Sequence, residues 1–405
     1  MDTNLFTCNA EILEIINRLK SDGIDEKIIS DAIDENNNQY VDLVQEGGGV
    51  LGIALLGYTY ILEQMGIRFF SLAGTSAGAI NTLMLASVGN VDEAKSRTIL
   101  EILANKNLFD FVDGPFTVRK LFNSILNDAW IGSKVFWGLS VLPHLFKYKG
   151  LNPGNNFLDW ISGIISVNQI NTTHDLLDKR IRPATLKLRK NAEGNVDDLI
   201  PKMKIIAADI TTESRVIFPE MNKLFWNKPD EVNPAYFLRA SMSIPGFFHP
   251  FEVSIGDKVK KNDWEEIVKY RGEIPEKVSF VDGGVMSNFP IDVFHNRSRV
   301  PRLPTFGVKL GDDRDKANKS GSIPQFLMSI FNSARHVLDF QFLLKNEDYE
   351  KLITKIDVGE HNWLNFSISD NDKVDLFIRG AQAAADFLTK FDWEGYKEIR
   401  RKMIE

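Results

Sequence analysis

The hydrophobic positions of this 405-residue chain alternate between short apolar runs and longer stretches with helical periodicity. Five runs have the length and composition of buried strands: residues 41–45, 69–73, 204–209, 278–282 and 305–310. Helical stretches follow the first two runs, at residues 53–65 and 77–85. Strands that alternate with helices form a mostly parallel sheet covered on both faces. The pattern therefore predicts a three-layer α/β/α fold.

Both ends of the chain are predicted to be helical. Apolar residues recur at helical spacing between Ala10 and Leu19, and a polar linker follows at residues 35–39. Near the other end, residues 323–347 and 373–391 are predicted to be helices that pack on the core. We therefore divide the chain into an N-terminal helical extension, residues 1–40, and a domain over residues 41–405. The last helices of that domain occupy about residues 320–405.

The sequence Gly74-Thr75-Ser76-Ala77-Gly78 lies between the second predicted strand and its helix. It has the pattern G-x-S-x-G, which is typical of a nucleophile on a tight strand-to-helix turn. Small neighbours allow that turn, and the N–H groups of the following helix point to where oxyanion charge would develop. The pattern in this context predicts that Ser76 is a nucleophile.

A glycine-rich loop, Gly47-Gly48-Gly49, follows the first predicted strand. Its exposed N–H groups are candidate donors to the oxyanion of a tetrahedral intermediate. The loop also matches the dinucleotide fingerprint G-x-G-x-x-G at Gly47, Gly49 and Gly52. That reading needs an acidic residue about 20 positions further on, and residues 68–74 contain none. A third interpretation is purely structural: the glycines allow the strand to pack closely on the helix that follows.

The strand at residues 278–282 delivers Asp282 into a Gly-Gly turn. An Asp-Gly pair at a strand end is usually an ordinary turn, but a serine nucleophile needs a base. No histidine lies in a clear strand-end loop late in the chain, where a hydrolase would place one. Asp282 is therefore the better candidate base. The six histidines are His144, His174, His249, His295, His336 and His361.

The order of these motifs resembles the patatin-like phospholipase family. The resemblance spans roughly residues 41–310 and includes two further blocks. Residues 237–248 resemble the family's alanine-serine…isoleucine-proline-glycine-phenylalanine block, and residues 149–154 resemble its glycine-leucine turn. Leu51 departs from the pattern, because many members carry arginine or lysine at that place in the glycine loop. The charge near the bound acyl or phosphate group is then expected to differ.

The resemblance implies a phospholipase A-type lipid acyl hydrolase with a role in lipid degradation. Ser76 would be the nucleophile and Asp282 the base of a Ser–Asp dyad, and Gly47, Gly48 and Gly49 would line the oxyanion hole. Hydrolysis would pass through an acyl-enzyme. Because a carboxylate is a weak base at its ordinary pKa of about 4, desolvation would have to help. No spaced His, Cys and Glu set is visible, so no metal or other cofactor is expected.

The composition limits the partners and the compartment. A net charge of −7 and a pI near 5.6 argue against nucleic acid, and against strong attraction to anionic lipid without a local basic patch. The single cysteine, Cys8, excludes an internal disulfide. No signal peptide and no apolar run of about 20 residues is visible. We expect a cytoplasmic enzyme with a lipid or phospholipid substrate; the oligomeric state is not readable.

Residues 109–148 are rich in aromatic residues, with lysines among them. They are either core helices that cover the sheet or an amphipathic lid that contacts the membrane surface. The sequence leaves both readings open. The residues in question are Phe111, Phe116, Phe122, Trp130, Phe136, Trp137, Leu142, Leu145 and Phe146, with Lys120, Lys134 and Lys147.

A second function class also remains open. The chain could be a catalytically silent or nucleotide-binding regulatory module on the same fold. Leu51 is the main support for that alternative.

Overall fold

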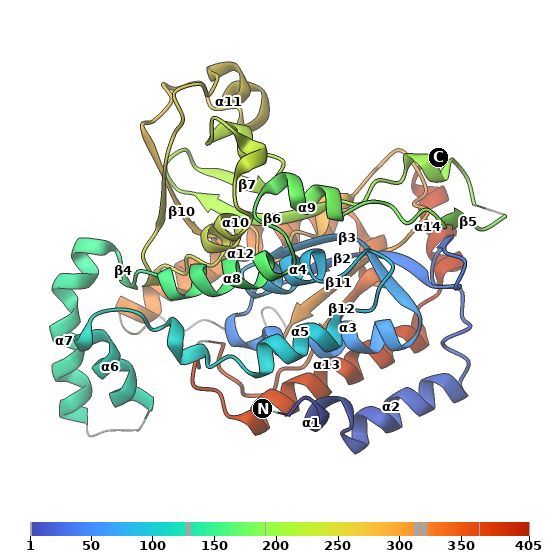
Figure 1. Cartoon of the computed structure of the whole chain (residues 1–405), viewed down its shortest axis with the longest axis horizontal. Helices are drawn as coiled ribbons and strands as arrows, with labels where there is room; N and C mark the ends of the chain where they lie inside the picture. The colour runs from blue at the N-terminus through green and yellow to red at the C-terminus, as the bar shows by residue number, and fades with distance from the viewer. Residues whose placement is uncertain are drawn as a thin grey trace.

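The computed structural model describes residues 2–126, 131–190, 192–311, 317, 321, 323–363 and 365–404. Figure 1 shows a central sheet between two layers of helices. Helices α3, α5 and α13 lie below strands β2 and β3 in that view, and α9 lies above them. The predicted three-layer α/β/α fold is confirmed.

The main sheet has a parallel centre with antiparallel additions at its margins. Strands β12, β11, β2, β3 and β6 are neighbours in that order, and every pair among them is parallel. Strand β6 then pairs antiparallel with β10 and β7, and β10 pairs antiparallel with β9. Within the described residues the sheet has ten strands: β1 (Ala32–Ile33), β2 (Gln39–Gln45), β3 (Ile67–Thr75), β5 (Lys187–Leu188), β6 (Met203–Asp209), β7 (Ser214–Phe218), β9 (Phe251–Ser254), β10 (Lys277–Asp282), β11 (Thr305–Leu310) and β12 (Ile353–Ile356). A separate small sheet pairs β4 (Gly150–Asn152) with β8 (Gly246–Phe248).

The five strands predicted from apolar runs correspond to β2, β3, β6, β10 and β11. Strand β3 is almost entirely buried, because helices cover both faces of the sheet. The helices of the described chain are α1 (Asn4–Thr7), α2 (Ala10–Ser21), α3 (Gly52–Gln64), α4 (Ala77–Ser87), α5 (Ser96–Ala104), α6 (Phe116–Leu126), α7 (Ile131–Tyr148), α8 (Asn155–Val167), α9 (Thr173–Lys179), α10 (Ala235–Ser241), α11 (Lys261–Val268), α12 (Ile323–Lys345), α13 (Asp370–Lys390) and α14 (Trp393–Ile404).

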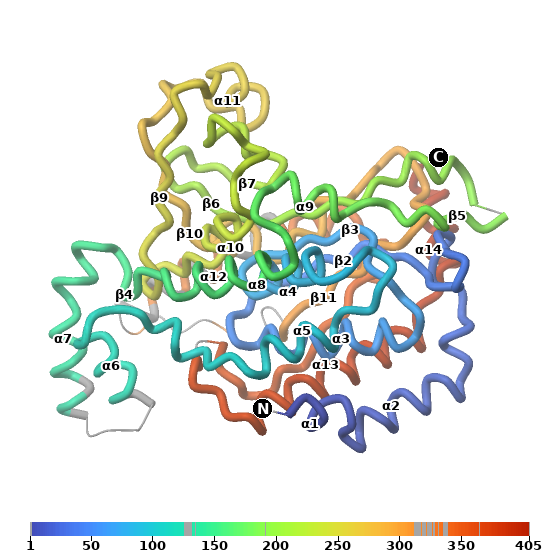
Figure 2. Tube along the Cα trace, viewed as in Figure 1, coloured from blue at the N-terminus to red at the C-terminus, as the bar shows by residue number. Residues whose placement is uncertain are grey.

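The N-terminal segment is helical only in its first part. Helices α1 and α2 end at Ser21, and β1 then joins the edge of the sheet by pairing with β2. Phe6 of α1 is buried and packs edge to face on Phe377 of α13, with ring centroids 5.4 Å apart. The segment thus extends the helical layer below the sheet, as Figure 2 shows. The division into residues 1–40 and 41–405 stays a prediction.

Helices α6 and α7 form a hairpin that projects from one end of the molecule (Figures 1 and 2). Residues 109–148 include both buried and exposed aromatic side chains. Phe111 is buried, and Phe122 packs on Phe247 of β8 with ring centroids 5.6 Å apart. Phe136 and Phe146 of α7, in contrast, are 62% and 80% exposed. Trp130 and the side chain of Lys134 lie outside the described residues.

No helix that the structure describes is both long enough and apolar enough to cross a bilayer.

Candidate active site

Ser76 occupies a strained turn between the end of β3 and the start of α4. Its φ of 52° and ψ of −118° are unusual for a residue with a side chain. The turn is tight because α4 starts at Ala77, directly after the serine. Gly78 allows this close approach, since a Cβ there would collide with the carbonyl oxygen of Gln45 in β2. The structure therefore has the strand–turn–helix context that the G-x-S-x-G pattern predicts.

The last residue of α10 and the residue that follows it hold this turn in place. The Ser76 N–H donates a 2.9 Å hydrogen bond to Ser241 Oγ, and Ser76 Oγ lies 3.4 Å from Met242 Sδ. Ser76 is only 4% exposed. The strained backbone is thus fixed by contacts from a distant part of the chain, as sparsely populated conformations require.

Strand β6 brings Asp282 to the same place. In β6, Ile206 pairs with Thr75, the last residue of β3, and the next residue, Ala207, pairs with Asp282, the last residue of β10. Strand β7 occupies the other edge of β6 over these positions. Strands β3 and β10 therefore share one edge of β6 and meet there end to end. Ser76, which follows β3, lies where the two strands meet.

Asp282 is anchored on two sides. Its Oδ1 accepts a 2.7 Å hydrogen bond from the Gly284 N–H, and its own N–H donates to the Ser243 carbonyl at 2.9 Å. The side chain is 4% exposed. Ser241 and Met242 contact Ser76, and Ser243 follows them directly. The segment at the end of α10 therefore positions the backbones of both candidate catalytic residues.

Ser76 and Asp282 line one small cavity of about 10 Å³, which is the volume of roughly one water molecule. The three glycines predicted for the oxyanion hole line it as well. Its full lining is Gly47, Gly48, Gly49, Ser76, Ile244, Asp282, Asn288 and Trp363. A Cβ on Gly47 would lie 3.0 Å from the Ser76 Cβ, which shows how closely the loop approaches the serine.

The three glycine N–H groups differ in what they contact. The Gly47 N–H donates a 3.0 Å hydrogen bond to the Asn288 carbonyl. The N–H groups of Gly48 and Gly49 have no acceptor among the described residues. Gly49 has φ +56°, and a Cβ there would collide with the Trp363 carbonyl oxygen, so this position requires glycine. Of the three glycines, Gly48 and Gly49 therefore line the cavity with N–H groups that have no described acceptor.

Asn288 also lines the cavity, although it was not among the site residues predicted from the sequence. Its Nδ2 donates 3.1 Å hydrogen bonds to Glu46 Oε1 and to the Gly47 carbonyl. Glu46 is itself held by the Leu310 N–H at 2.7 Å and lies 3.8 Å from the Lys309 ammonium. Asn288 thus ties the glycine loop to the chain that follows Asp282. Its position six residues after Asp282 was the only available signal.

Asp339 of α12 supports the Asn288 loop from behind. Its carboxylate accepts 2.7 Å hydrogen bonds from Ser287 Oγ and from the Phe289 N–H. Burial raises the pKa of Asp339 to about 7, and the nearby Glu46 carboxylate acts in the same direction. Asp339 lies in a distant helix with no motif around it, so this contact could not be predicted from the sequence.

No described histidine side chain lines the Ser76 cavity. His249 Nε2 lies 3.3 Å from His144 Nε2, and His295 Nδ1 lies 2.9 Å from the Tyr349 hydroxyl. His361 contacts Asp375, and His174 contacts Asp178 on the surface. The side chain of His336, in α12, lies outside the described residues.

A match to a known family identifies the protein family of this chain. Residues 43–295 match the family model for patatin-like phospholipases. The chain belongs to the patatin-like phospholipase family. This assigns it to the lipid hydrolases at the level of the family and implies lipid substrates. The match contains the glycine loop, Ser76 and Asp282.

Two individual proteins are similar over most of the chain. The uncharacterized protein YqhO of Bacillus subtilis (strain 168) is 27% identical over 357 residues, which cover 87% of this chain and all of that protein. The crystal structure of VipD from Legionella pneumophila aligns over 90% of this chain and 71% of that one, with 14% identity and a TM-score of 0.35. That structural similarity is too distant to carry any detail of the site.

Leu51, the departure from the patatin-like pattern, is buried at the start of α3. It packs in the hydrophobic core and does not line the Ser76 cavity. A leucine at this position therefore adds core packing next to the glycine loop.

Proposed function

We propose that this patatin-like protein is a phospholipase A-type acyl hydrolase that uses Ser76 as nucleophile and Asp282 as base. The observation that carries the proposal is the shared cavity: a strained serine, a buried carboxylate and two N–H groups without a described acceptor line the same small space. A purely structural strand–helix junction does not need this combination.

The chemistry follows from the roles of these groups. Asp282 takes the proton from Ser76 Oγ as the oxygen attacks the ester carbonyl, and the Gly48 and Gly49 N–H groups donate to the oxyanion. The leaving alcohol takes the proton from Asp282 as the C–O bond breaks, which leaves an acyl ester on Ser76. Asp282 then deprotonates a water that attacks this ester. Collapse of the second intermediate releases the fatty acid and returns the proton to Ser76.

The cavity is too small for a lipid ester. At about 10 Å³ it holds no acyl chain, and Ile244 and Trp363 are the two large apolar residues in its lining. The Trp363 carbonyl accepts a 3.0 Å hydrogen bond from the Val50 N–H beside the glycine loop. We propose that Trp363 moves away when substrate enters, and that a short ester requires a smaller movement than a phospholipid.

A fluorophosphonate probe tests the proposal directly, because it labels an activated serine and does not label an inert binding fold. We expect labelling of the wild type, no labelling of Ser76→Ala, and release of fatty acid from a phospholipid panel by the wild type alone. Labelling equal in both proteins would contradict the assignment of Ser76. Absence of labelling in a folded wild type would favour the silent or nucleotide-binding module, which nucleotide titration would then examine.

We further propose that the α6–α7 hairpin contacts the lipid surface. The exposed apolar side chains of α7 follow helical spacing and form one stripe, which we call the α7 stripe: Val135, Phe136, Leu139, Leu142 and Phe146. Lys120 and Lys147 lie over the Phe116 and Tyr148 rings, at 5.2 and 4.9 Å from the ring centroids. Aromatic residues next to lysines suit the boundary between lipid and water.

The hairpin is also connected to the candidate active site. Phe122 of α6 packs on Phe247, and Phe247 stacks on Phe366 with ring centroids 4.4 Å apart. Phe366 lies three residues after Trp363, which lines the cavity. Contact between the hairpin and lipid is therefore well placed to bias the proposed movement of Trp363.

A further inference from the structure

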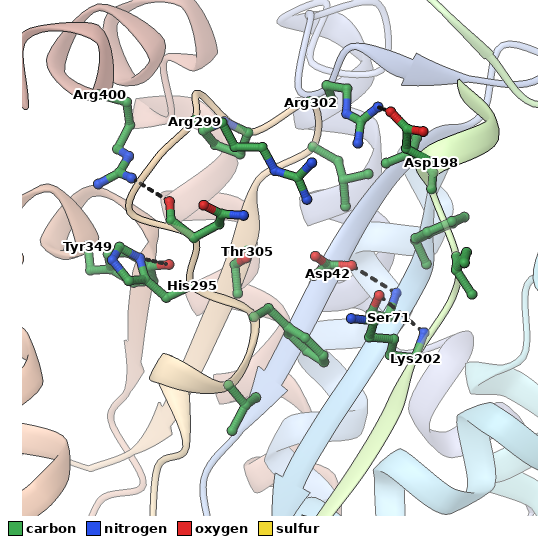
Figure 3. Close-up of a pocket in the computed structure, with 18 of the residues that line it drawn as sticks. Asp42, Ser71, Asp198, Lys202, His295, Arg299, Arg302, Thr305, Tyr349 and Arg400 are labelled. Carbon is green, nitrogen blue, oxygen red and sulfur yellow. Dashed lines mark hydrogen bonds and ion pairs between the residues drawn. The ribbon is translucent and has the colours of Figure 1, made fainter. Parts of the chain in front are cut away.

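A second, larger cavity lies at the opposite end of the parallel strands from Ser76. Its volume is about 310 Å³, within the range of small-molecule sites. Thr305, the first residue of β11, and Asp42, its partner in the middle of β2, form part of the floor. Ser76, in contrast, follows the last residue of β3. Figure 3 shows this pocket between the sheet and the chain around Arg299.

An irregularity in the sheet shapes the floor. The register between β2 and β3 shifts between Val41 and Leu43, which opens the ladder at Asp42. Asp42 Oδ1 accepts a 3.0 Å hydrogen bond from the Ser71 N–H, and Ser71 Oγ accepts one of 3.3 Å from the Lys202 N–H. Burial raises the pKa of Asp42 to about 6. The floor thus offers a carboxylate that can accept hydrogen bonds from hydroxyl groups.

Cationic side chains outnumber carboxylates around the cavity. Four cations line it, Lys202, Arg299, Arg302 and Arg400, against two carboxylates, Asp42 and Asp198. Two of the arginines are held by the protein. Arg302 lies 3.4 Å from Asp198, while Arg400 lies 3.4 Å from Asp348 and donates a 2.8 Å hydrogen bond to the Asn296 carbonyl.

The other two cations are not paired. Within the described part of the chain, no carboxylate lies within ion-pair distance of Lys202 or Arg299, although the charge of Lys202 acts to lower the pKa of Asp42. Figure 3 shows the Arg299 guanidinium extending over the pocket, on the side of Arg302 and Asp42. A free guanidinium aimed at a cavity is suited to bind a phosphate or carboxylate through two parallel hydrogen bonds.

His295 adds a neutral polar group to the wall. Its Nδ1 lies 2.9 Å from the Tyr349 hydroxyl, whereas its buried Nε2 has no partner among the described residues. A buried polar nitrogen without a partner costs free energy. An oxygen of a bound molecule would satisfy it.

We propose that this cavity binds a small phosphorylated polyol. The phosphate would lie between Arg299 and Lys202, and hydroxyl groups would donate to Asp42. Phosphate is favoured over a neutral ligand because the two unpaired groups are both cationic. A soluble ligand is favoured over a lipid headgroup because Tyr396 and Arg400 of α14 line the cavity, and α14 lies at the end of the molecule opposite the α6–α7 hairpin (Figure 1).

Calorimetric titration of full-length Ser76→Ala protein tests the proposal, since this background excludes turnover and separates binding from the proposed hydrolysis. Glycerol 3-phosphate and ribose 5-phosphate are the probes, with glycerol and inorganic phosphate as partial ligands. We expect saturable binding of a phosphorylated polyol, and at least tenfold weaker binding after Arg299→Ala or Lys202→Ala at an unchanged melting temperature. Arg297→Ala is the matched control, because Arg297 is exposed in the same loop and does not line the cavity.

Three other outcomes of these titrations would each overturn the proposal. An absence of saturable binding by both phosphorylated polyols would show that the cavity does not take this class of ligand. An equal loss in Arg297→Ala and Arg299→Ala would indicate diffuse attraction to a basic surface. Binding of phosphatidic acid vesicles without binding of either soluble probe would assign the cations to a lipid headgroup.

Discussion

Ser76 and Asp282 reach one cavity although 205 positions separate them in the sequence, because the strands that precede them end against the same edge of β6. Strand β3 runs parallel to β6 and β10 runs antiparallel to it, so their last residues meet head to head. The pairing of Thr75 with Ile206 and of Asp282 with Ala207 sets their spacing. The geometry of the proposed dyad is thus a property of the sheet, not of a flexible loop.

Ser76→Ala is expected to lower ester hydrolysis by at least ~10³-fold. The substitution removes one small oxygen and keeps the Ser76 N–H bond to Ser241, so the melting temperature should change by no more than about 2 °C. Turnover of a p-nitrophenyl ester and a melting curve measure both effects. Retained activity in the folded variant would show that another residue is the nucleophile.

Asp282→Asn is expected to lower activity by ~10²–10⁴-fold, the usual contribution of a general base. The histidine variants His249→Ala and His295→Ala should lose no more than a few-fold, because neither side chain lines the Ser76 cavity. His336→Ala belongs in the same series, since its side chain is not described. A histidine variant as inactive as Asp282→Asn would replace the proposed dyad by a triad.

The strands and the strained serine could be predicted from local sequence, whereas the environment of the site could not. Apolar runs and the G-x-S-x-G pattern depend on neighbouring residues, so β3, Ser76 and α4 follow from a short window. Asp339 and Trp363 reach the site from segments with no chemical motif, and only tertiary packing brings them there. From the sequence, Asp42 is simply part of a predicted strand, because nothing in the sequence reveals the shift in register between β2 and β3.

The N-terminal segment illustrates the same limit. Helical periodicity correctly placed α2, since its buried face follows from residue spacing. The same periodicity says nothing about residues 22–38, where polar residues surround the short strand β1. That strand exists because the edge of β2 and the strand β5 offer it hydrogen-bond partners.

Asn288→Ala is expected to lower kcat by about 10²-fold, with a smaller effect on KM. The variant loses the two Nδ2 hydrogen bonds to Glu46 and Gly47, so the glycine loop is no longer fixed against Ser76. Asn288 is a positioning residue in this argument. Steady-state kinetics on a short ester separate kcat from KM, and a pure rise in KM would instead place Asn288 in substrate binding.

The raised pKa of buried Asp339 is expected to make the stability of the folded protein depend on pH. Its folded-state pKa is about 7, against an ordinary value of 3.8 that the unfolded chain keeps. Between about pH 4 and pH 7 the folded protein therefore holds a proton that the unfolded chain has released. Raising the pH through this window lowers the free energy of unfolding, by at most ~1.4 kcal/mol per pH unit.

The comparison of wild type with Asp339→Asn isolates this effect, since the amide does not titrate. The stability of the wild type relative to the variant should fall as the pH rises to about 7 and level off above it. Urea unfolding at intervals of about one pH unit measures the difference. A difference that is constant across this range would mean that Asp339 titrates at its ordinary pKa.

The last prediction concerns two neighbouring aromatic rings of α7, Phe136 of the α7 stripe and Trp137 beside it. Phe136→Ser combined with Trp137→Ser is expected to weaken binding to phosphatidylcholine vesicles and to slow hydrolysis of vesicle lipid by at least ~10-fold, while hydrolysis of a short soluble ester is retained. Phe136 is exposed and Trp137 is half-buried against Phe116 and Phe136, so both rings lie at the surface of the hairpin and neither lies in the core of the sheet. Removing the two rings takes away apolar area that would otherwise enter the lipid boundary.

Val167→Ser is the matched control for this double variant. Val167 ends α8 and is 85% exposed, yet it lies outside the hairpin, so its replacement should leave both activities unchanged. Vesicle sedimentation, a fatty-acid assay and a melting curve together distinguish the two readings of the segment. An equal loss on vesicle lipid and soluble ester, with a lowered melting temperature, would mark Phe136 and Trp137 as structural. A loss confined to vesicle lipid, at an unchanged melting temperature, is the result expected of a surface that brings Ser76 to the bilayer.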